Sequence, residues 1–295
     1  MTLPNFLVIG AGRSGTTSLH HYLQEHPDVY IPAVKSPSHF YCCGGEHQAT
    51  PDYFVPDPAD YEALFDGVRN ETAIGEVSPA YLATVHAASR IAERLPHVKL
   101  VGLLRHPVDR VFARFVGRCR DGLEHRTSFA DVMRDELKAP LVRDEAAGTY
   151  LAAGFVSRFL ASYVNRFSSD QIRLHLFEDL QRDPAGLLRN IYTFLDVDPA
   201  FVPDVSRRHN QSGGVVRNPL LRRAWVGSAS LRERVRPGVP AAVRDRLFRL
   251  VTRNLDPVRL DPALRAELTD LYREDIERLS AMLNRDLSHW LTRAG

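Results

Sequence analysis

Lysine is scarce in this chain, and neither sign of charge is in excess. The 295 residues include 38 lysines and arginines against 36 aspartates and glutamates, for a formal net charge of +2 at pH 7. A nucleic-acid-binding protein would carry a strong basic excess, so the balance argues against such a surface and leaves room for a local anion pocket. Only Lys35, Lys99 and Lys138 are lysines, and the other 35 basic residues are arginines, whose planar guanidinium groups suit phosphate or sulfate.

Cysteine is also scarce, and the sequence shows neither a long apolar run nor the pattern of a signal peptide. The three cysteines, Cys42, Cys43 and Cys119, cannot all pair within the chain, and they lack the CxxC spacing of a metal site. No apolar run is long enough to span a bilayer, and the N-terminus lacks the features of a signal peptide. We therefore expect a cytoplasmic protein in a reducing compartment, without a transmembrane segment.

Short apolar runs followed by helical patterns indicate the fold class. Such runs occur at residues 6–9 and 98–104, a third strand is expected at residues 171–177, and a helix-like segment follows each of the three. Continuous apolar strands that alternate with helices are typical of parallel sheets covered on both faces. The sequence thus predicts an α/β protein with a P-loop-like three-layer fold, in which a central parallel β-sheet is flanked by helices.

The chain is expected to form one domain over residues 1–295. Residues 32–60 and 203–219 are interpreted as functional loops, because no long Ser/Gly-rich or charged linker separates two halves of the chain. Near the C-terminus, Asp261 and Pro262 can cap and begin a helix. Leucine and isoleucine then recur at helical spacing, which predicts packing against the core.

The most informative segment, residues 10–18, lies between the first expected strand and the first expected helix. It reads Gly-Ala-Gly-Arg-Ser-Gly-Thr-Thr-Ser. Its glycines, including Gly15, let the backbone approach an anion closely, and the helix start presents free N–H groups. Arg13 adds a full positive charge, so the segment predicts a phosphate-binding loop. Further hydrogen-bond donors are the hydroxyls of Ser14, Thr16, Thr17 and Ser18.

Two other kinds of nucleotide site fit less well. A P-loop NTPase would carry lysine directly after Gly15, where this chain has Thr16, and an acidic magnesium ligand after the second strand, where it has Arg105. A dinucleotide site would favour small apolar residues where Thr16, Thr17 and Ser18 follow the glycines. The loop is therefore suited to bind a phosphate without a metal ion.

Several segments, in chain order, resemble the sulfotransferases that use 3′-phosphoadenosine 5′-phosphosulfate (PAPS), in their bacterial and heparan-type branch. Residues 6–19 resemble the 5′-phosphosulfate loop of that family. Residues 103–110, Leu-Leu-Arg-His-Pro-Val-Asp-Arg, resemble its 3′-phosphate-binding strand and helix. The other matching segments are residues 26–29, 35–40, 75–82, 177–180 and 194–195. Each motif is short, and it is the ordered set that makes the resemblance specific.

The resemblance implies transfer of a sulfuryl group from PAPS to a hydroxyl, or second to that an amine, with release of adenosine 3′,5′-bisphosphate (PAP). Arg13 and the loop from Ser14 to Ser18 would hold the 5′-phosphate, and Lys35 would stabilise the sulfuryl group. Arg105 would bind the 3′-phosphate, with Arg217 as a further contact. The serine that accompanies Arg105 in the family is replaced by Ala113 here. The motifs require no metal ion.

The general base is the assignment that the motifs leave open. In the heparan-type branch a glutamate follows the lysine that matches Lys35, and here that position is Ser36. His39 and Glu76 lie in the neighbouring motifs and are the two candidates. Histidine titrates near neutrality, so we place His39 first, whereas Glu76 would need a tuned pKa.

Two alternative functions stay open at this point. One is a magnesium-dependent P-loop kinase or NTPase, and the other is a nucleotide-binding protein that has lost catalysis, as the departures at Ser36, Val77 and Ala113 would allow. The acceptor is expected to be a small molecule, a lipid or a saccharide, in a pocket shaped by residues 32–60 and 117–148. The sequence indicates no nucleic-acid partner and no particular oligomeric state.

Overall fold

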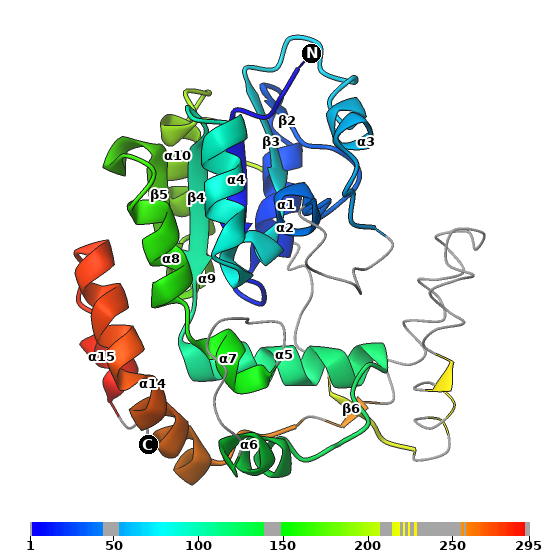
Figure 1. Cartoon of the computed structure of the whole chain (residues 1–295), viewed down its shortest axis with the longest axis vertical. Coiled ribbons are helices and arrows are strands. Elements are labelled where there is room, and N and C mark those ends of the chain that lie inside the picture. Colours follow the sequence, from blue (N-terminus) through cyan, green and yellow to red (C-terminus); the bar gives the residue numbers. More distant parts are fainter. Residues whose placement is uncertain are drawn as a thin grey trace.

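A parallel β-sheet of five strands lies at the centre of the structure (Figure 1). The structure is a computed structural model that describes residues 2–43, 53–138, 149–206, 214–218, 221, 224, 227–228, 255–256 and 258–292. The sheet has the spatial order β2-β3-β1-β4-β5, and its strands are β1 (Phe6–Gly10), β2 (Val29–Tyr30), β3 (Ala73–Val77), β4 (Lys99–Leu104) and β5 (Ile172–Leu176). A separate antiparallel pair consists of β6 (Val215–Val216) and β7 (Leu255–Asp256).

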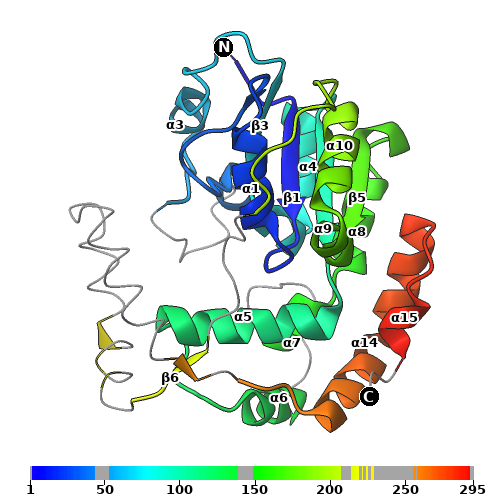
Figure 2. The same ribbon diagram turned by 180° about the vertical axis from the view of Figure 1, so that it is seen from behind.

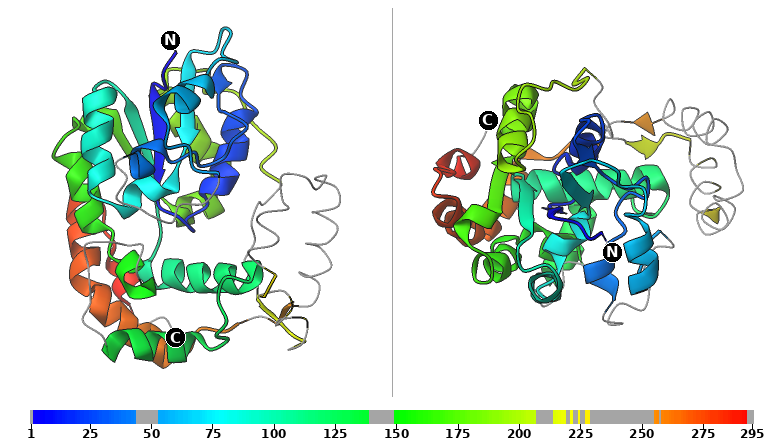
Figure 3. Two further views of the ribbon diagram at one scale, coloured as in Figure 1. Left: turned by 45° about the vertical axis from the view of Figure 1, so that its right-hand side comes forward. Right: turned by 90° about the horizontal axis from the view of Figure 1, so that it is seen from above.

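Helices cover both faces of this sheet, and α5 crosses below its carboxyl edge (Figures 1 and 3). The α-helices are α1 (Thr16–Gln24), α2 (His39–Cys42), α3 (Pro58–Ala63), α4 (His86–Arg94), α5 (Pro107–Asp121), α6 (Phe129–Lys138), α7 (Tyr150–Gly154), α8 (Ser157–Val164), α9 (Phe177–Arg182), α10 (Pro184–Phe194), α14 (Pro262–Leu283) and α15 (Ser288–Leu291). Two short 3₁₀ helices are η1 (Pro79–Ala83) and η2 (Ser169–Gln171). Within the described residues, none of these helices is both long and apolar enough to cross a membrane.

The alternation of side chains along β1 divides the core into two layers. Phe6 and Val8 are fully buried in the cluster that includes side chains of α1 and α10, whereas Leu7 and Ile9 are fully buried in the cluster on the side of α4 and α8. Figure 2 shows α1, α9 and α10 on the face opposite to α4. This arrangement confirms the predicted three-layer fold with a central parallel sheet.

The order of the strands places the switch point of the sheet, where open parallel sheets form a ligand-binding crevice, at the end of β1. The chain leaves β1 through α1 toward β2 and β3, and it then crosses through α4 to β4 on the other side of β1. In open parallel sheets, ligands bind at the carboxyl ends of the strands where the direction of winding changes. The segments that follow β1, β3, β4 and β5 therefore meet at one edge, and these segments contain the motifs found in the sequence.

Most of the predicted elements are present, with small shifts at their ends. The strands expected at residues 6–9, 98–104 and 171–177 are β1, β4 and β5. The first helix begins at Thr16, two residues before the expected start. Helix α14 begins at Pro262 as predicted, and the Asp261 side chain accepts a hydrogen bond from the Ala263 N–H at 2.8 Å.

Candidate functional site

The loop between β1 and α1 lies at the crevice and is shaped by glycine. Gly15 has a φ of 91°, and a Cβ added there would lie only 2.7 Å from Cδ2 of Leu180 on α9. Ser14 is fully buried, and its Oγ has no hydrogen-bond partner among the described residues. A buried hydroxyl without a partner is costly, and an anion held by the loop would satisfy it. The loop thus fits the phosphate group that the sequence predicts for it.

Two cationic side chains meet at this loop. Lys35 donates a hydrogen bond from Nζ to Oγ1 of Thr17 at 2.5 Å. Burial, with a second contribution from the nearby Arg13 charge, lowers the pKa of Lys35 from 10.5 to about 8. Two like charges brought together in a half-buried position favour an anion between them. The structure therefore brings Arg13, Thr17 and Lys35 to one place.

Arg105 follows β4 and contacts the same loop from the other side. Its Nη1 donates to the backbone oxygen of Arg13 at 3.0 Å, and its guanidinium lies over the ring of Phe177, 4.5 Å from the centroid. Burial lowers the pKa of Arg105, while the carboxylates of Asp109 and Glu178 act in the opposite direction. The Arg105 side chain is thus held at the crevice by a backbone contact and an aromatic face.

Arg110 is the last residue of the motif at residues 103–110, and it is buried on α5. Its Nε donates to the backbone oxygen of Gly12 at 3.1 Å, and its Nη1 donates to the backbone oxygen of Ala153. The face of α5 that carries Arg110 therefore packs against the phosphate loop.

Glu76 lies in β3 and is almost completely buried. Its Oε1 accepts hydrogen bonds from the hydroxyls of Tyr61 at 2.9 Å and Tyr81 at 2.5 Å, and its Oε2 accepts from Oγ of Ser78 at 2.6 Å. Oγ of Ser78 in turn accepts from the N–H of Ser38 at 3.0 Å. Burial raises the pKa of Glu76, and the three hydroxyl donors oppose that shift. The carboxylate therefore fastens the segment after Lys35 to the sheet.

His39 begins α2 and is linked to this carboxylate through Tyr61, whose hydroxyl donates to Glu76. Its ring stacks on Tyr61 with centroids 4.4 Å apart, and its Nδ1 lies 2.9 Å from the backbone oxygen of Val55. A carbonyl can only accept, so Nδ1 carries the proton and Nε2 carries the lone pair. Burial lowers the pKa of His39, which favours the neutral ring.

Arg217 lies apart from these groups. It follows β6, is exposed, and donates from Nε to Oδ1 of Asp256 at 2.7 Å. Strand β6 packs against α5, near the end of that helix far from β4 (Figure 3). Residues 207–213 of the functional loop expected at 203–219 lie outside the described residues, as do residues 44–52 and 139–148 of the expected acceptor loops.

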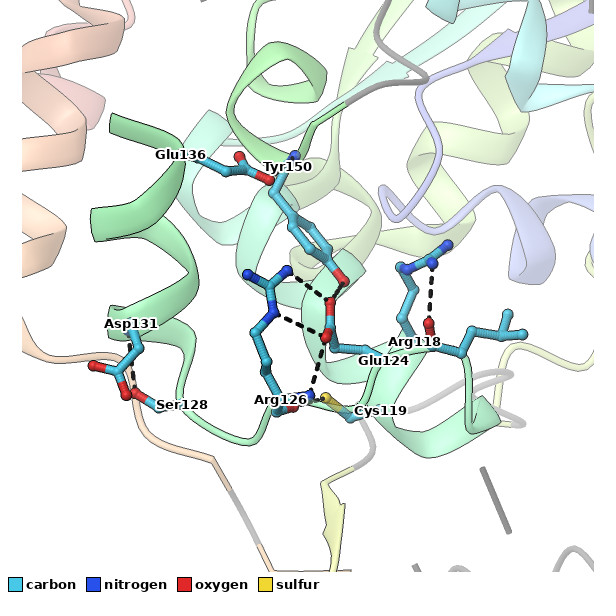
Figure 4. Close-up of polar contacts among 9 residues, drawn as sticks. Arg118, Cys119, Glu124, Arg126, Ser128, Asp131, Glu136 and Tyr150 are labelled. Carbon is cyan, nitrogen blue, oxygen red and sulfur yellow. Dashed lines mark hydrogen bonds and ion pairs between the residues drawn. The ribbon is translucent and has the colours of Figure 1, made fainter. Parts of the chain in front are cut away.

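A polar cluster beyond α5 was not indicated by any sequence motif (Figure 4). The carboxylate of Glu124 accepts hydrogen bonds from the Tyr150 hydroxyl at 2.9 Å and from the Arg126 N–H at 3.0 Å. Hydrogen bonds from Arg126 and Tyr150 outweigh burial and lower the pKa of Glu124 to about 2. Glu136 accepts from the N–H groups of Tyr150 and Leu151. The cluster fixes the start of α7 against the segment that follows α5.

The C-terminal helices brace the strand ends that surround the crevice. Nε2 of His106 lies 2.9 Å from the backbone oxygen of Trp290, and the Trp290 indole N–H donates to Glu178 at 2.8 Å. Arg285 donates from both terminal nitrogens to the carboxylate of Asp179. Trp290 therefore joins the segment after β4 to the segment after β5.

Comparisons with other proteins show the family to which the chain belongs. A sequence profile of the sulfotransferase family matches residues 46–201. The crystal structure of a sulfotransferase from Alicyclobacillus acidocaldarius is similar over 99% of this chain and 100% of that chain, with 30% sequence identity and a TM-score of 0.75.

Two longer proteins match parts of the chain. The human bifunctional heparan sulfate N-deacetylase/N-sulfotransferase 2 is 26% identical over 208 residues, which cover 67% of this chain and 22% of that protein. The membrane-associated sulfotransferase kil1 of Dictyostelium discoideum is 34% identical over 117 residues, which cover 39% of this chain and 23% of that protein. The chain thus spans less than a quarter of either relative. Since the family profile covers more than half of its residues, and a solved sulfotransferase matches almost all of it, the chain belongs to the sulfotransferase family.

Proposed function

We propose that this protein transfers a sulfuryl group from PAPS to a hydroxyl acceptor and releases PAP. The observation that carries the proposal is the meeting of Arg13, Thr17 and Lys35 at a loop with a buried Ser14 hydroxyl that lacks a partner. An amine is the second acceptor class, because the heparan sulfate relatives include N-sulfotransferases.

The loop side chains are suited to the charge that develops during this transfer. As the acceptor oxygen bonds to sulfur, the bond from sulfur to the bridging oxygen breaks, and negative charge collects on the 5′-phosphate. Lys35, Arg13 and the N–H groups at the start of α1 would stabilise that charge. The hydroxyls of Thr16, Thr17 and Ser18 complete the proposed 5′-phosphosulfate site with Ser14 and Gly15. Charge neutralisation by these cations needs no metal ion.

Arg105 is proposed to bind the 3′-phosphate. It is half-buried, donates to the backbone oxygen of Arg13, and lies over the ring of Phe177. A guanidinium group held in this way suits bidentate contact with a phosphate. Arg217 remains in the proposal as a further phosphate contact, which requires that it exchange the carboxylate of Asp256 for the ligand.

His39 is proposed as the general base that removes the acceptor proton. Its Nδ1 proton is held by Val55, and its lowered pKa keeps Nε2 able to accept a proton at pH 7. Both oxygens of Glu76 already accept hydroxyl hydrogen bonds, so Glu76 is the second candidate and has a clear positioning role for the segment after Lys35.

The remaining parts of the proposal concern the acceptor and the setting of the reaction. We propose a small-molecule, lipid or saccharide acceptor, and a single domain over residues 1–295. A cytoplasmic location is supported by Cys42, Cys43 and Cys119, which form no disulfide among the described residues. A bacterial source is supported by the similarity to the Alicyclobacillus protein.

Calorimetric titration with PAP tests the donor site. Wild-type protein should bind PAP, and Arg105→Ala should weaken binding by about tenfold or more, since a hydrogen bond to a charged group is typically worth that much. Arg134→Ala is the matched control, because Arg134 is exposed and pairs with Asp131 on the distant α6. Absence of binding at millimolar PAP would refute the proposal, and magnesium-dependent ATP turnover would favour the kinase alternative. Binding without transfer to any acceptor would favour the alternative that has lost catalysis.

A further inference from the structure

A glycine lies inside α5, where it weakens the helix. Gly117 is buried four residues before the last residue of the helix. Glycine is a poor helix former because it loses the most backbone freedom on folding, so alanine would suit this helical position better. An interior glycine of this kind calls for a packing reason.

The packing reason is the guanidinium group of Arg13. A Cβ added to Gly117 would lie 2.5 Å from Cζ, 2.5 Å from Nη2 and 2.6 Å from Nη1 of Arg13. Nearly equal distances to three atoms of a plane place the guanidinium face-on against the helix backbone. A side chain at position 117 would require the guanidinium to move, since Cβ atoms essentially never make contacts shorter than 3.0 Å.

The same face of α5 follows the phosphate loop over two helical turns. Arg110, seven residues before Gly117, donates to the backbone oxygen of Gly12. The backbone of Arg13 is also held, because its carbonyl oxygen accepts from Arg105. At the far end, Nη2 of Arg13 lies 3.8 Å from Oδ2 of Asp121. Both ends of the Arg13 residue are therefore fixed, and the flat contact with Gly117 sets the plane of the charged group.

We propose that Gly117 is a positioning residue. Because it has no side chain, the Arg13 guanidinium can pack flat on the helix backbone at this position, which we call the seat, and is held there beside Lys35 at the donor site. This inference rests on the proposed function, because Arg13 is assigned there to the 5′-phosphosulfate. Its prediction is unusual for a buried position: the substitution that strengthens the helix weakens donor binding.

Gly117→Ala tests the seat, with PAP calorimetry and thermal unfolding on the same samples. The variant should bind PAP about tenfold or more weakly than wild type, as expected for loss of a charge-assisted contact. Its Tm should be unchanged or raised by about 2 °C, since alanine is the better helix former. Gly227→Ala is the control, because no heavy atom lies within 4 Å of a Cβ added at that position.

A double-mutant cycle separates the seat from a general effect on the helix. In an Arg13→Ala background there is no guanidinium to displace, so Gly117→Ala should leave PAP affinity unchanged. Additive losses in the double variant would overturn the proposal. So would a Gly117→Ala variant that binds PAP as wild type does.

A second measurement does not depend on the donor. With only three lysines in the chain, selective ¹³C labelling gives a short NMR spectrum in which Lys35 can be titrated directly. Displacement of Arg13 should raise the pKa of Lys35, because the Arg13 charge helps to lower it. If this pKa rises but wild-type protein binds no PAP, the seat stands and the proposed function fails. If wild type binds PAP but Gly117→Ala changes neither affinity nor pKa, the seat fails and the function stands.

Discussion

The lowered pKa of Lys35 should make the proposed binding of PAP depend on pH in a range where PAP itself does not titrate. With a pKa of about 8, Lys35 in the free protein is about nine-tenths protonated at pH 7 and about one-tenth protonated at pH 9. The phosphates of PAP have their second pKa near 6 and stay ionised across that interval. If the bound anion requires the protonated amine, PAP affinity should fall about tenfold between pH 7 and pH 9, or about 1.4 kcal/mol.

Calorimetry at a series of pH values measures this step, and two variants identify its source. Lys35→Arg should bind PAP with little change over the interval, because guanidinium stays protonated. Lys35→Met should bind weakly and also show no step. Lys138→Met should keep the wild-type profile, since Lys138 is exposed and pairs with Asp135 on α6. A flat wild-type profile, or a step that survives in Lys35→Met, would refute the assignment of Lys35 to the donor site.

The contribution of Lys35 to the free energy of unfolding is expected to change with pH in the opposite direction to PAP affinity. The pKa of Lys35 is lower in the folded protein than its ordinary value of 10.5, so between about pH 8 and pH 10.5 the unfolded chain binds more protons than the folded chain. The contribution of this group to stability therefore increases with pH in that window, while donor binding decreases. Weaker PAP binding at pH 9 cannot then be attributed to unfolding through Lys35.

Two further predictions concern the base and the loop. His39→Ala should slow single-turnover transfer about 100-fold at saturating PAPS, as is typical for loss of a general base, without a change in PAP affinity. The exposed control His289→Ala should transfer at the wild-type rate. An unchanged rate in both His39→Ala and Glu76→Gln would exclude both residues as the base. Gly15→Ala should abolish measurable PAP binding and lower the free energy of unfolding by about 1–3 kcal/mol, because the left-handed φ of Gly15 and its contact with Leu180 leave no room for a methyl group. Chemical denaturation measures this loss, and a stability equal to that of wild type would contradict this account of the loop.

The strands that could be predicted from the sequence are those whose own residues show a strand pattern. The strands β1 and β4 carry nearly continuous apolar runs, whereas β5 alternates apolar and polar residues in the pattern Ile-Arg-Leu-His-Leu; all three positions were predicted to within a residue or two. Strand β3 was not predicted, because Gly75 and Glu76 interrupt its apolar pattern. Its place in the sheet is set by β1, whose Phe6 ring occupies the space where a Cβ of Gly75 would lie, only 2.5 Å away.

The residues of the candidate site also fall into those that a local motif predicts and those that it does not. The loop and Arg105 were recognised because a local motif carries them, and Lys35 because it lies in a further motif. The contact of Arg110 with Gly12 and the contact of His106 with Trp290 could not be predicted, because each joins residues 98 or 184 positions apart in the chain. Glu76 was found as a titratable group. Its three hydroxyl partners, which occupy both carboxylate oxygens, could not be predicted because they come together only when the sheet and η1 are assembled.

The contact between His106 and Trp290 has a consequence for how the protein is made. A chain emerging from the ribosome presents β1, β4 and β5 long before Trp290 is available, so the sheet can assemble while the segments after β4 and β5 are still unbraced. Contacts of such high sequence separation form late, after the loop-closure entropy has been overcome. The donor site should therefore mature as a final step of folding, and a nascent chain that stops before α15 should hold a sheet without a rigid anion site.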